Sequence, residues 1–388
     1  MTSTTHHNVR LLTWFNFCLD FRIYGAITAL YFAQVTGSYT LGLSVFAIGT
    51  IASSLFEVPT GVFSDFIGRK RTLILGQFAG VLGVLCYAIG GSFFVLALGA
   101  VLEGLASALF SGNNSALLYE SLKEDNLESE YATYEGKASS MFQFALAFSA
   151  LIGALVLGWW TFAVLFWLSV IPQVIGLGIA FNFVDPKVKY NKVSTNIFEH
   201  FGKALQKFWQ DAKLRTLSLA KIIDQGLGEA LHQLFPILSA MLWPVWALSL
   251  ATFLASMFAA VGFRVAGGFV KKFGEPKVLL GSGAVNFVIK TAIIAYPTVA
   301  TPFINTLTSF TFATGVVAQN SLQQKGFTDE QRATMSSLTS LAGSAMFAIS
   351  ALGLGMLADT VGPVQALLVG QIITICVLIL YWRVSKMH

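Results

Sequence analysis

The sequence is poor in charged residues. Asp, Glu, Lys and Arg together account for only 11% of the 388 residues, whereas 55% are hydrophobic. Soluble globular proteins carry about 25% charged residues, which they need to cover their surface. The composition therefore excludes a water-soluble globule of this size and predicts an integral membrane protein.

Cysteine is also scarce, and motifs for catalysis or cofactor binding are lacking. The three cysteines, Cys18, Cys86 and Cys376, all lie in apolar runs, where a thiol behaves as a small hydrophobic group. Their spacing excludes a disulfide framework and a metal site. Since the sequence has no Gly-x-x-x-x-Gly-Lys loop, no His-Glu-x-x-His motif and no nucleophile constellation, we expect neither ATP use, nor a cofactor, nor enzymatic activity.

Long apolar runs, by contrast, are abundant. A helix needs about 20 residues to cross the hydrocarbon layer, and Gly, Pro, Asn or charged residues interrupt the runs at about that spacing. The sequence predicts an all-α membrane protein with twelve transmembrane helices. The expected spans are residues 11–35, 41–63, 72–90, 93–117, 138–158, 162–184, 214–242, 245–270, 278–296, 299–320, 333–357 and 364–382.

Lys and Arg are missing from one set of connections between these spans. The loop at residues 61–71 contains Arg69, Lys70 and Arg71, and such cations are retained on the cytoplasmic side. In this orientation none of the 24 Lys and Arg falls in an outward loop, and both termini are expected in the cytoplasm. The net charge of +5 then reflects topology rather than nucleic-acid binding. The polar first ten residues precede no short apolar stretch with a cleavage site, so we expect the first span to direct insertion.

The chain divides near its middle. Residues 185–213 form a basic linker whose apolar residues recur at helical spacing, as in a helix lying flat among lipid headgroups. The linker separates residues 1–184 from residues 214–388, which we expect to form two pseudo-symmetric bundles of six helices. A degenerate repeat supports this division, because the spacing of Gly61, Asp65 and Gly68 recurs within residues 267–274.

The loop after the second span resembles the signature of the major facilitator superfamily of secondary transporters, Gly-x-x-x-Asp-x-x-Gly-Arg-Lys. The match is complete at Gly61, Asp65, Gly68, Arg69 and Lys70. The resemblance covers essentially the whole chain, with a 6 + 6 division and a degenerate copy of the loop after the eighth span. It implies the fold of that family.

The resemblance also implies a cytoplasmic gate. Asp65 and Arg69 are expected to bridge to the start of the eleventh span, near Arg332, and to close the cytoplasmic side in the outward-facing state. Two subfamily patterns are not followed. Ala100 replaces the Arg of the Leu-x-x-x-Arg-x-x-Gln-Gly pattern of many proton-coupled members, and the fifth span lacks the Gly-Pro element of drug/proton antiporters.

Ionisable residues within the spans are the candidates for function. An ionised side chain at the bilayer centre costs roughly 2.5 to 3.5 kcal/mol on insertion scales, so such groups face a cavity or a partner. They are Asp20, Arg22, Glu57, Glu103, Lys221, Asp224, Glu229, His232, Arg264 and Lys290.

Helical spacing places the polar residues of the first, fourth, seventh and tenth spans on one face of each helix. In the superfamily these four spans line the central cavity. We therefore expect their polar stripes to line the transport cavity and to supply proton-coupling groups. The candidates are Asn16, Asp20, Tyr24, Tyr31, Glu103, Ser107, Asn114, Lys221, Asp224, Gln225, Glu229, His232, Asn305, Thr308, Phe312 and Gln319.

Each candidate also has a structural interpretation. The alternative for the acidic residues is ion pairing, such as Lys221 with Asp224, and the alternative for His232 and the aromatic residues is packing. Glu57, Arg264 and Lys290 lie on other spans and are expected to be structural.

These observations favour a bacterial inner-membrane secondary transporter that works by alternating access. We expect proton-coupled export of an amphiphilic or cationic compound, because acidic residues share the stripes with many aromatic ones. The alternative is uptake of a nutrient or anionic metabolite through Arg22, Lys221 and Lys290, or simple facilitation. A third possibility is a membrane-embedded enzyme or a scaffold. The expected partners are a small-molecule substrate, protons and the lipid bilayer, and the chain is expected to be a monomer.

Overall fold

The computed structural model describes residues 3–186, 212–326 and 329–387, and within these ranges it contains helices and no strand. The expected all-α architecture is therefore confirmed for the described part of the chain. The expected linker helix falls almost entirely outside that part. The side chains of Asp65 and Arg332 also lie outside the description, so the contact expected near them lies outside it as well.

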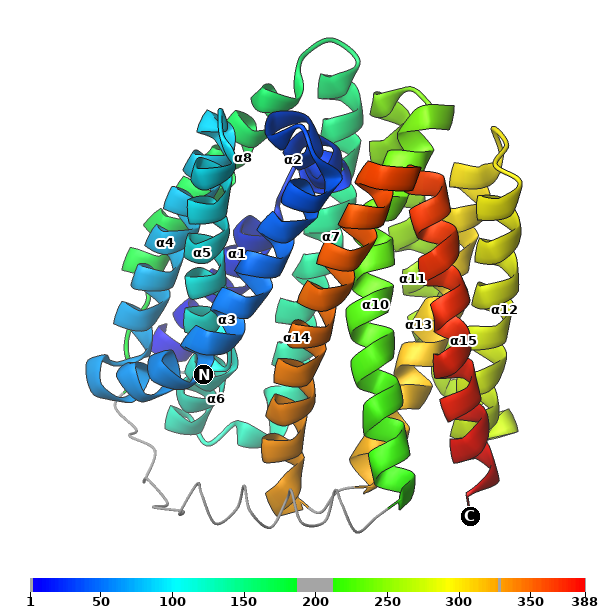
Figure 1. The fold of residues 1–388 in the computed structure, drawn as a ribbon. Helices are drawn as coiled ribbons and strands as arrows, with labels where there is room; N and C mark the ends of the chain where they lie inside the picture. Colours follow the sequence, from blue (N-terminus) through cyan, green and yellow to red (C-terminus); the bar gives the residue numbers. More distant parts are fainter. Residues whose placement is uncertain (1–2, 187–211, 327–328, 388) are drawn as a thin grey trace. The chain divides into compact units, whose positions relative to one another are not determined.

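The helices follow one another in chain order (Figure 1). The first set comprises α1 (Ser3–Asp20), η1 (Gly25–Ile27), α2 (Thr28–Thr36), α3 (Tyr39–Ile67), α4 (Arg69–Ile89), α5 (Phe93–Phe110), α6 (Asn113–Glu124), η2 (Glu128–Glu130), α7 (Tyr131–Leu157) and α8 (Phe162–Phe181). The second set comprises α10 (Ala212–Leu242), α11 (Val245–Phe273), α12 (Glu275–Ala295), α13 (Thr301–Gly326), α14 (Asp329–Val361) and α15 (Pro363–Lys386).

Two of the expected spans are not continuous helices, which corrects the sequence-based assignment. The first, 11–35, is broken between Asp20 and Gly25, and the fourth, 93–117, is broken between Phe110 and Asn113. At the second break Gly112 has a φ of 74°, a left-handed conformation that glycine adopts without steric cost. The apolar runs continue through both breaks, so hydropathy alone does not reveal them.

Nine helices of the described part are long and apolar enough to cross a membrane. The helices of the first, seventh and tenth expected spans, α1, α10 and α13, are not among them. α10 and α13 carry polar stripes, which lower their mean hydropathy, and α1 begins with polar residues and contains only the first part of a broken span. The hydropathy criterion thus passes over helices whose polar faces make them candidates for function.

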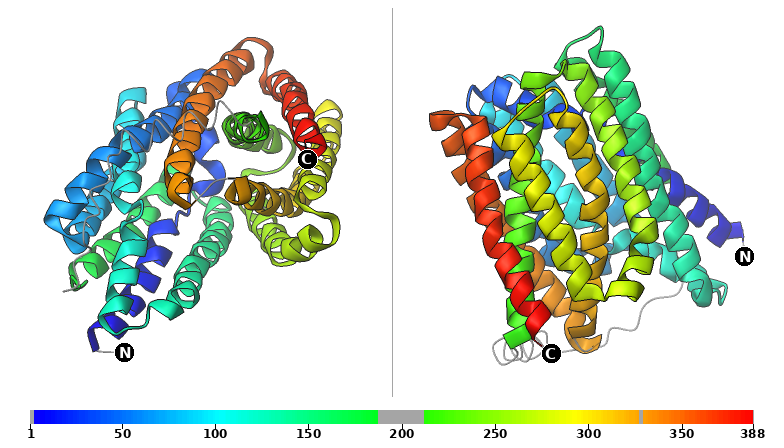
Figure 2. Two further views of the ribbon diagram at one scale, coloured as in Figure 1. Left: turned by 90° about the horizontal axis from the view of Figure 1, so that it is seen from below. Right: turned by 90° about the vertical axis from the view of Figure 1, so that its right-hand side faces the viewer.

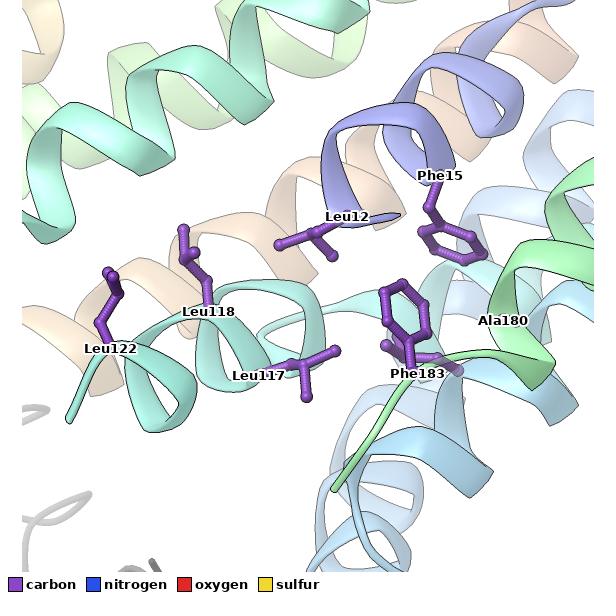
Figure 3. Close-up of a cluster of buried hydrophobic side chains, with 8 residues drawn as sticks. Leu12, Phe15, Leu117, Leu118, Leu122, Ala180 and Phe183 are labelled. Atoms are coloured by element: carbon purple, nitrogen blue, oxygen red, sulfur yellow. The ribbon is translucent and has the colours of Figure 1, made fainter. Parts of the chain in front are cut away.

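The helices gather into two compact units. The first contains Met1–Thr36 and Ile48–Lys192. Within it α4 packs against α5 and α8, and α1 packs against α6, α7 and α8. Figure 3 shows part of its core, a cluster of buried side chains contributed by α1, α4, α6 and the end of α8. The cluster comprises Leu12, Phe15, Leu73, Leu117, Leu118, Leu122, Ala180 and Phe183.

The second unit contains Gly37–Ala47 and Val193–His388. Within it α10 packs against α14 and α15, and α12 and α11 both pack against α13. Figures 1 and 2 show α15, in red, beside α12, in yellow. Its core cluster draws on α10, α12, α13 and α15, which belong to the first, third, fourth and sixth expected spans of their half, as α1, α4, α6 and α8 do in the first unit. The cluster comprises Leu217, Ala220, Val278, Leu279, Ala318, Val377, Tyr381 and Val384.

The repeat found in the sequence has a structural counterpart. Gly68 precedes α4 with φ 91° and ψ 162°, and Gly274 precedes α12 with φ 80° and ψ 151°. Both conformations lie in the region of positive φ that side chains with a Cβ disfavour. The same sharp turn therefore leads into the helix of the third expected span of each half, which explains why glycine occurs at both positions.

Candidate functional site

An irregular segment, residues 21–24, separates α1 from η1. The N–H of Arg22 donates to the Asp20 carbonyl over 2.9 Å, and the N–H of Gly25 donates to the Arg22 carbonyl over 3.0 Å. The α-helical hydrogen-bond ladder is therefore broken here. Inside a membrane, non-helical backbone is tolerated only where protein buries it or where it lines a water-filled cavity. This segment is consequently a candidate for function rather than a simple connection.

The break presents Arg22 and Tyr24 to Glu103 on α5, and these three residues form the first polar centre. Arg22 Nη1 donates to Glu103 Oε2 over 2.8 Å, and Tyr24 Oη donates to Glu103 Oε1 over 3.4 Å. The Arg22 side chain is 40% exposed and that of Glu103 16%. Gly83 on α4 leaves the necessary space, because a Cβ there would lie 2.8 Å from Glu103 Cγ. Both carboxylate oxygens are thus engaged, and the charge of Arg22 is compensated.

Tyr24 and Tyr31 are buried in an aromatic cluster around Phe166 of α8. Phe166 is fully buried, and its ring centroid lies 4.4 Å from that of Tyr24 and 4.3 Å from that of Tyr31. Tyr31 Oη donates to the Tyr87 carbonyl over 2.8 Å. The two tyrosines therefore have a packing role, and Tyr24 in addition contacts the first polar centre.

The second polar centre lies within the second unit and consists of Asp224 on α10, Gln319 on α13 and Tyr381 on α15. Tyr381 Oη donates to Asp224 Oδ2 over 2.7 Å, and Gln319 Nε2 donates to Tyr381 Oη over 2.5 Å. Lys290 on α12 is close enough to interact electrostatically with Asp224. A carboxylate, a hydroxyl and an amide group from three helices thus converge.

Lys221 and Asp224 of α10 have partners other than each other. Lys221 Nζ donates to Gln323 Oε1 and, over 3.5 Å, to Asn320 Oδ1, both on α13. Asp224, only three residues away, is instead bonded to Tyr381. The structure therefore does not show the Lys221–Asp224 ion pair that the sequence offers as an alternative.

The polar stripe of α10 is exposed along most of its length. Asp224, Gln225, Glu229 and His232 are all exposed, whereas Leu227 and Ala230 between them are buried. Glu229 Oε1 accepts a hydrogen bond from Gln233 Nε2 over 2.7 Å. This face of α10 is thus exposed, and its expected place in a transport cavity stays a prediction.

The remaining candidates lie in varied surroundings. Asn114 Nδ2 donates to Asn16 Oδ1 over 3.3 Å, which joins the stripes of the first and fourth spans, while Ser107 is exposed. On α13 Thr308 and Gln319 are buried, Asn305 is half-buried and Phe312 is exposed. The tenth-span stripe therefore does not share one environment, although all four residues follow one helical face in the sequence.

The cytoplasmic signature forms a network within the first unit. Arg69 Nη1 donates to Ser64 Oγ over 2.8 Å and to Asn113 Oδ1 over 3.1 Å, and its Nε donates to Glu120 Oε1 over 3.2 Å. These bonds join α3 and α4 to α6. These three contacts of Arg69 thus lie within the first unit, and the bridge that the resemblance implies near Arg332 stays a prediction.

The loop of the signature is also bonded to the residue that follows α8. Asp185 Oδ1 accepts a hydrogen bond from the N–H of Lys70 over 2.9 Å, and its carboxylate lies against Gly68. A carboxylate at a helix N-terminus satisfies a free N–H and the helix dipole. Lys70 therefore contributes through its backbone at this contact.

Three residues with such contacts are not among the candidates that the sequence indicates. They are Glu120, Tyr381 and Gln173 on α8, whose Nε2 donates to the carbonyls of Cys18 and Leu19. Glu120 follows the expected fourth span, and Tyr381 and Gln173 are polar residues in apolar runs. A search of every span and its flanking residues for polar groups, rather than of the four striped spans alone, finds all three.

Comparison with known proteins identifies the family. The sequence model described as Major Facilitator Superfamily matches residues 11–351. An uncharacterized transporter of Buchnera aphidicola subsp. Schizaphis graminum is 27% identical over 212 residues, which are 52% of this chain and 51% of that protein. The chain thus matches about half the length of that relative.

Two solved structures share the fold. The structure of the nucleoside transporter NupG has a TM-score of 0.75 at 12% identity. The match covers 100% of this chain and 100% of that one. A bacterial homolog of the human lysosomal transporter Spinster, in an inward-facing and unoccupied conformation, has a TM-score of 0.78 at 14% identity, covering 100% of this chain and 98% of that one. With the family model matching most of its length, this chain belongs to the Major Facilitator Superfamily and is a multi-pass membrane protein.

Proposed function

We propose that the chain is a proton-coupled secondary transporter of the bacterial inner membrane that exports an amphiphilic or cationic small molecule by alternating access. The observation that carries this proposal is the state of the charges on the striped helices. Arg22 and Lys221 are bound by protein oxygen atoms, and the carboxylates of Asp224 and Glu229, each with one described hydrogen bond, belong to an exposed stripe. Exposed carboxylates can exchange protons or bind a cationic substrate.

The proposal includes the arrangement expected from the sequence. The six-helix halves are residues 1–184 and 214–388, residues 185–213 join them, and both termini face the cytoplasm. The working unit is a monomer. Labelling of cysteines placed at either terminus in intact and in inverted vesicles tests the orientation, because only inverted vesicles expose the cytoplasmic side.

The coupling is tested in proteoliposomes with an imposed pH gradient and ethidium as a lipophilic cationic probe. We expect ethidium flux to follow the gradient in the wild type and to be lost in Asp224→Asn, which keeps the shape of the side chain but removes its charge. Flux that is the same with and without the gradient would rule out proton coupling.

A second function has its own support. The Nε of Arg22 is buried without a hydrogen-bond partner, and Lys290 interacts electrostatically with Asp224. Cations placed in this way are suited to an anionic substrate, which favours uptake of an anionic metabolite. A drug-susceptibility panel in an efflux-deficient host separates the two, because export raises resistance to amphiphilic cations and uptake does not.

A further inference from the structure

The break in the first span leaves two carbonyl groups without their helical donors, and one side chain of α8 donates hydrogen bonds to both. In a continuous helix the carbonyls of Cys18 and Leu19 accept from the N–H groups of residues 22 and 23. Here Gln173 Nε2 donates to both carbonyls, over 3.3 Å and 3.0 Å. The N–H of Ile23 donates instead to Ser169 Oγ over 3.0 Å. Side chains of α8 therefore supply hydrogen-bond partners for backbone groups that the break leaves free.

Gln173 is itself held in a fixed orientation. Gln77 Nε2 on α4 donates to Gln173 Oε1 over 2.7 Å and to the Gln173 carbonyl over 2.9 Å. Both glutamines are buried. Gly176 makes room for Gln77, since a Cβ at that position would lie 2.9 Å from Gln77 Nε2. The Oε1 of Gln173 therefore faces α4, and its Nε2 faces α1.

The same face of α8 contacts the break a third time. Phe166, Ser169 and Gln173 are spaced by three and four residues and so share one helix face. The Phe166 ring stacks on that of Tyr24, with centroids 4.4 Å apart and planes inclined by 11°. One face of α8 therefore contacts the segment on both sides of Arg22.

We propose that Gln173, together with Ser169, is a positioning residue that keeps the first span interrupted and so holds Arg22 and Tyr24 on Glu103. An unpaired buried carbonyl is unfavourable. Without the amide of Gln173, the N–H groups of residues 22 and 23 are the available donors, and α1 gains stability by continuing through the break. Since each helical residue adds about 100°, a continuous helix redirects Arg22 away from Glu103. The consequence for transport rests on the proposed function, whereas the effect on the ion pair does not.

The test is a double-mutant cycle that reads out the Arg22–Glu103 pair through Tm in detergent. In the wild-type background Arg22→Met and Glu103→Gln each lower Tm, and we expect the double variant to lower it no further than one of them does. In the Gln173→Met background, where the side chain keeps its length but loses its amide, we expect this non-additivity to disappear. A general loss of stability would lower all Tm values without removing the non-additivity.

A matched control is Gln371→Met. Gln371 is a buried glutamine on α15, the sixth helix of the second set, and its Nε2 donates to Thr374 Oγ1 over 3.4 Å. This variant should leave the coupling between Arg22 and Glu103 unchanged. Loss of the coupling in Gln371→Met as well would overturn the specific role of Gln173.

A second variant covers the case in which Gln173→Met does not fold. Gln77→Met removes the group that orients Gln173 without touching the first span, and we expect it to weaken the coupling. If the coupling persists unchanged in Gln173→Met, or in Gln77→Met where only that variant folds, the proposal is wrong. Normal transport by Arg22→Met and Glu103→Gln would instead count against the proposed function and leave the positioning role intact.

Discussion

Tyr381 donates a hydrogen bond to Asp224 over 2.7 Å, although 157 residues separate them in the chain. The same hydroxyl accepts a hydrogen bond from Gln319, so α10, α13 and α15 meet at a single oxygen atom. A hydrogen bond to a charged group contributes about 1.5–3 kcal/mol. The hydroxyl therefore links the helices of the second unit and orients the carboxylate that we propose for coupling.

Tyr381→Phe should lower the stability of the protein and its transport rate. The substitution removes only the hydroxyl, and we expect a loss of about 1–2 kcal/mol because Asp224 is exposed and water replaces part of the bond. Thermal unfolding in detergent and flux in proteoliposomes measure the two effects. Tyr296→Phe is the control, since Tyr296 is 81% exposed, and it should change neither. Wild-type flux in Tyr381→Phe would show that the hydroxyl has no role in transport.

Glu103→Gln should destabilise the first unit by leaving Arg22 without its counter-charge. Breaking a fully buried pair costs about 3–5 kcal/mol, and we expect about 1–3 kcal/mol here because the Arg22 side chain is 40% exposed. Combining it with Arg22→Met should restore part of the loss, as measured by Tm. A double variant less stable than Glu103→Gln alone would contradict compensation of the two charges.

Gly83→Ala and Gly178→Ala should have opposite effects. A Cβ at Gly83 would lie 2.8 Å from Glu103 Cγ and 3.1 Å from the Gly99 carbonyl, so α4 and α5 must move apart. Overpacking of this kind costs about 1–3 kcal/mol. A Cβ at Gly178, within α8, meets nothing within 4 Å, and alanine should be neutral or stabilise the helix by up to about 1 kcal/mol. Equal Tm values for the two variants would argue against the close approach at Gly83.

Arg69→Lys should reduce transport while leaving insertion intact. Lysine keeps the charge but cannot bond Ser64, Asn113 and Glu120 at once from a planar group. Flux and the amount of protein in the membrane measure the two properties. Lys70→Gln, whose described bond is made by its backbone, should be milder. Full flux in Arg69→Lys would show that the network is dispensable.

Asp65→Asn should likewise insert normally and transport less. The reason is the gate role that the family signature implies for this carboxylate. Transport rates equal to those of the wild type would refute that role. This result would not depend on the outcome for Arg69→Lys.

The sequence predicted the helices well because their signals are local. A run of about 20 apolar residues is long enough to cross the hydrocarbon layer. Gly68 and Gly274 mark sharp turns in both halves. The sequence also placed Asp20, Glu103 and Asp224 on polar faces. It did not reveal the break at residues 21–24, because the donors that satisfy it come from α8, about 150 residues later.

Length, hydropathy and the loop signature were sufficient for a helical membrane protein of this superfamily, since each of them depends on neighbouring residues alone. Which polar groups meet was decided only by tertiary packing. Lys221 and Asp224 are three residues apart and take different partners, whereas Arg22 and Glu103 are 81 apart and bind each other. In a membrane interior each polar group must find a partner, and the rotation of packed helices selects it.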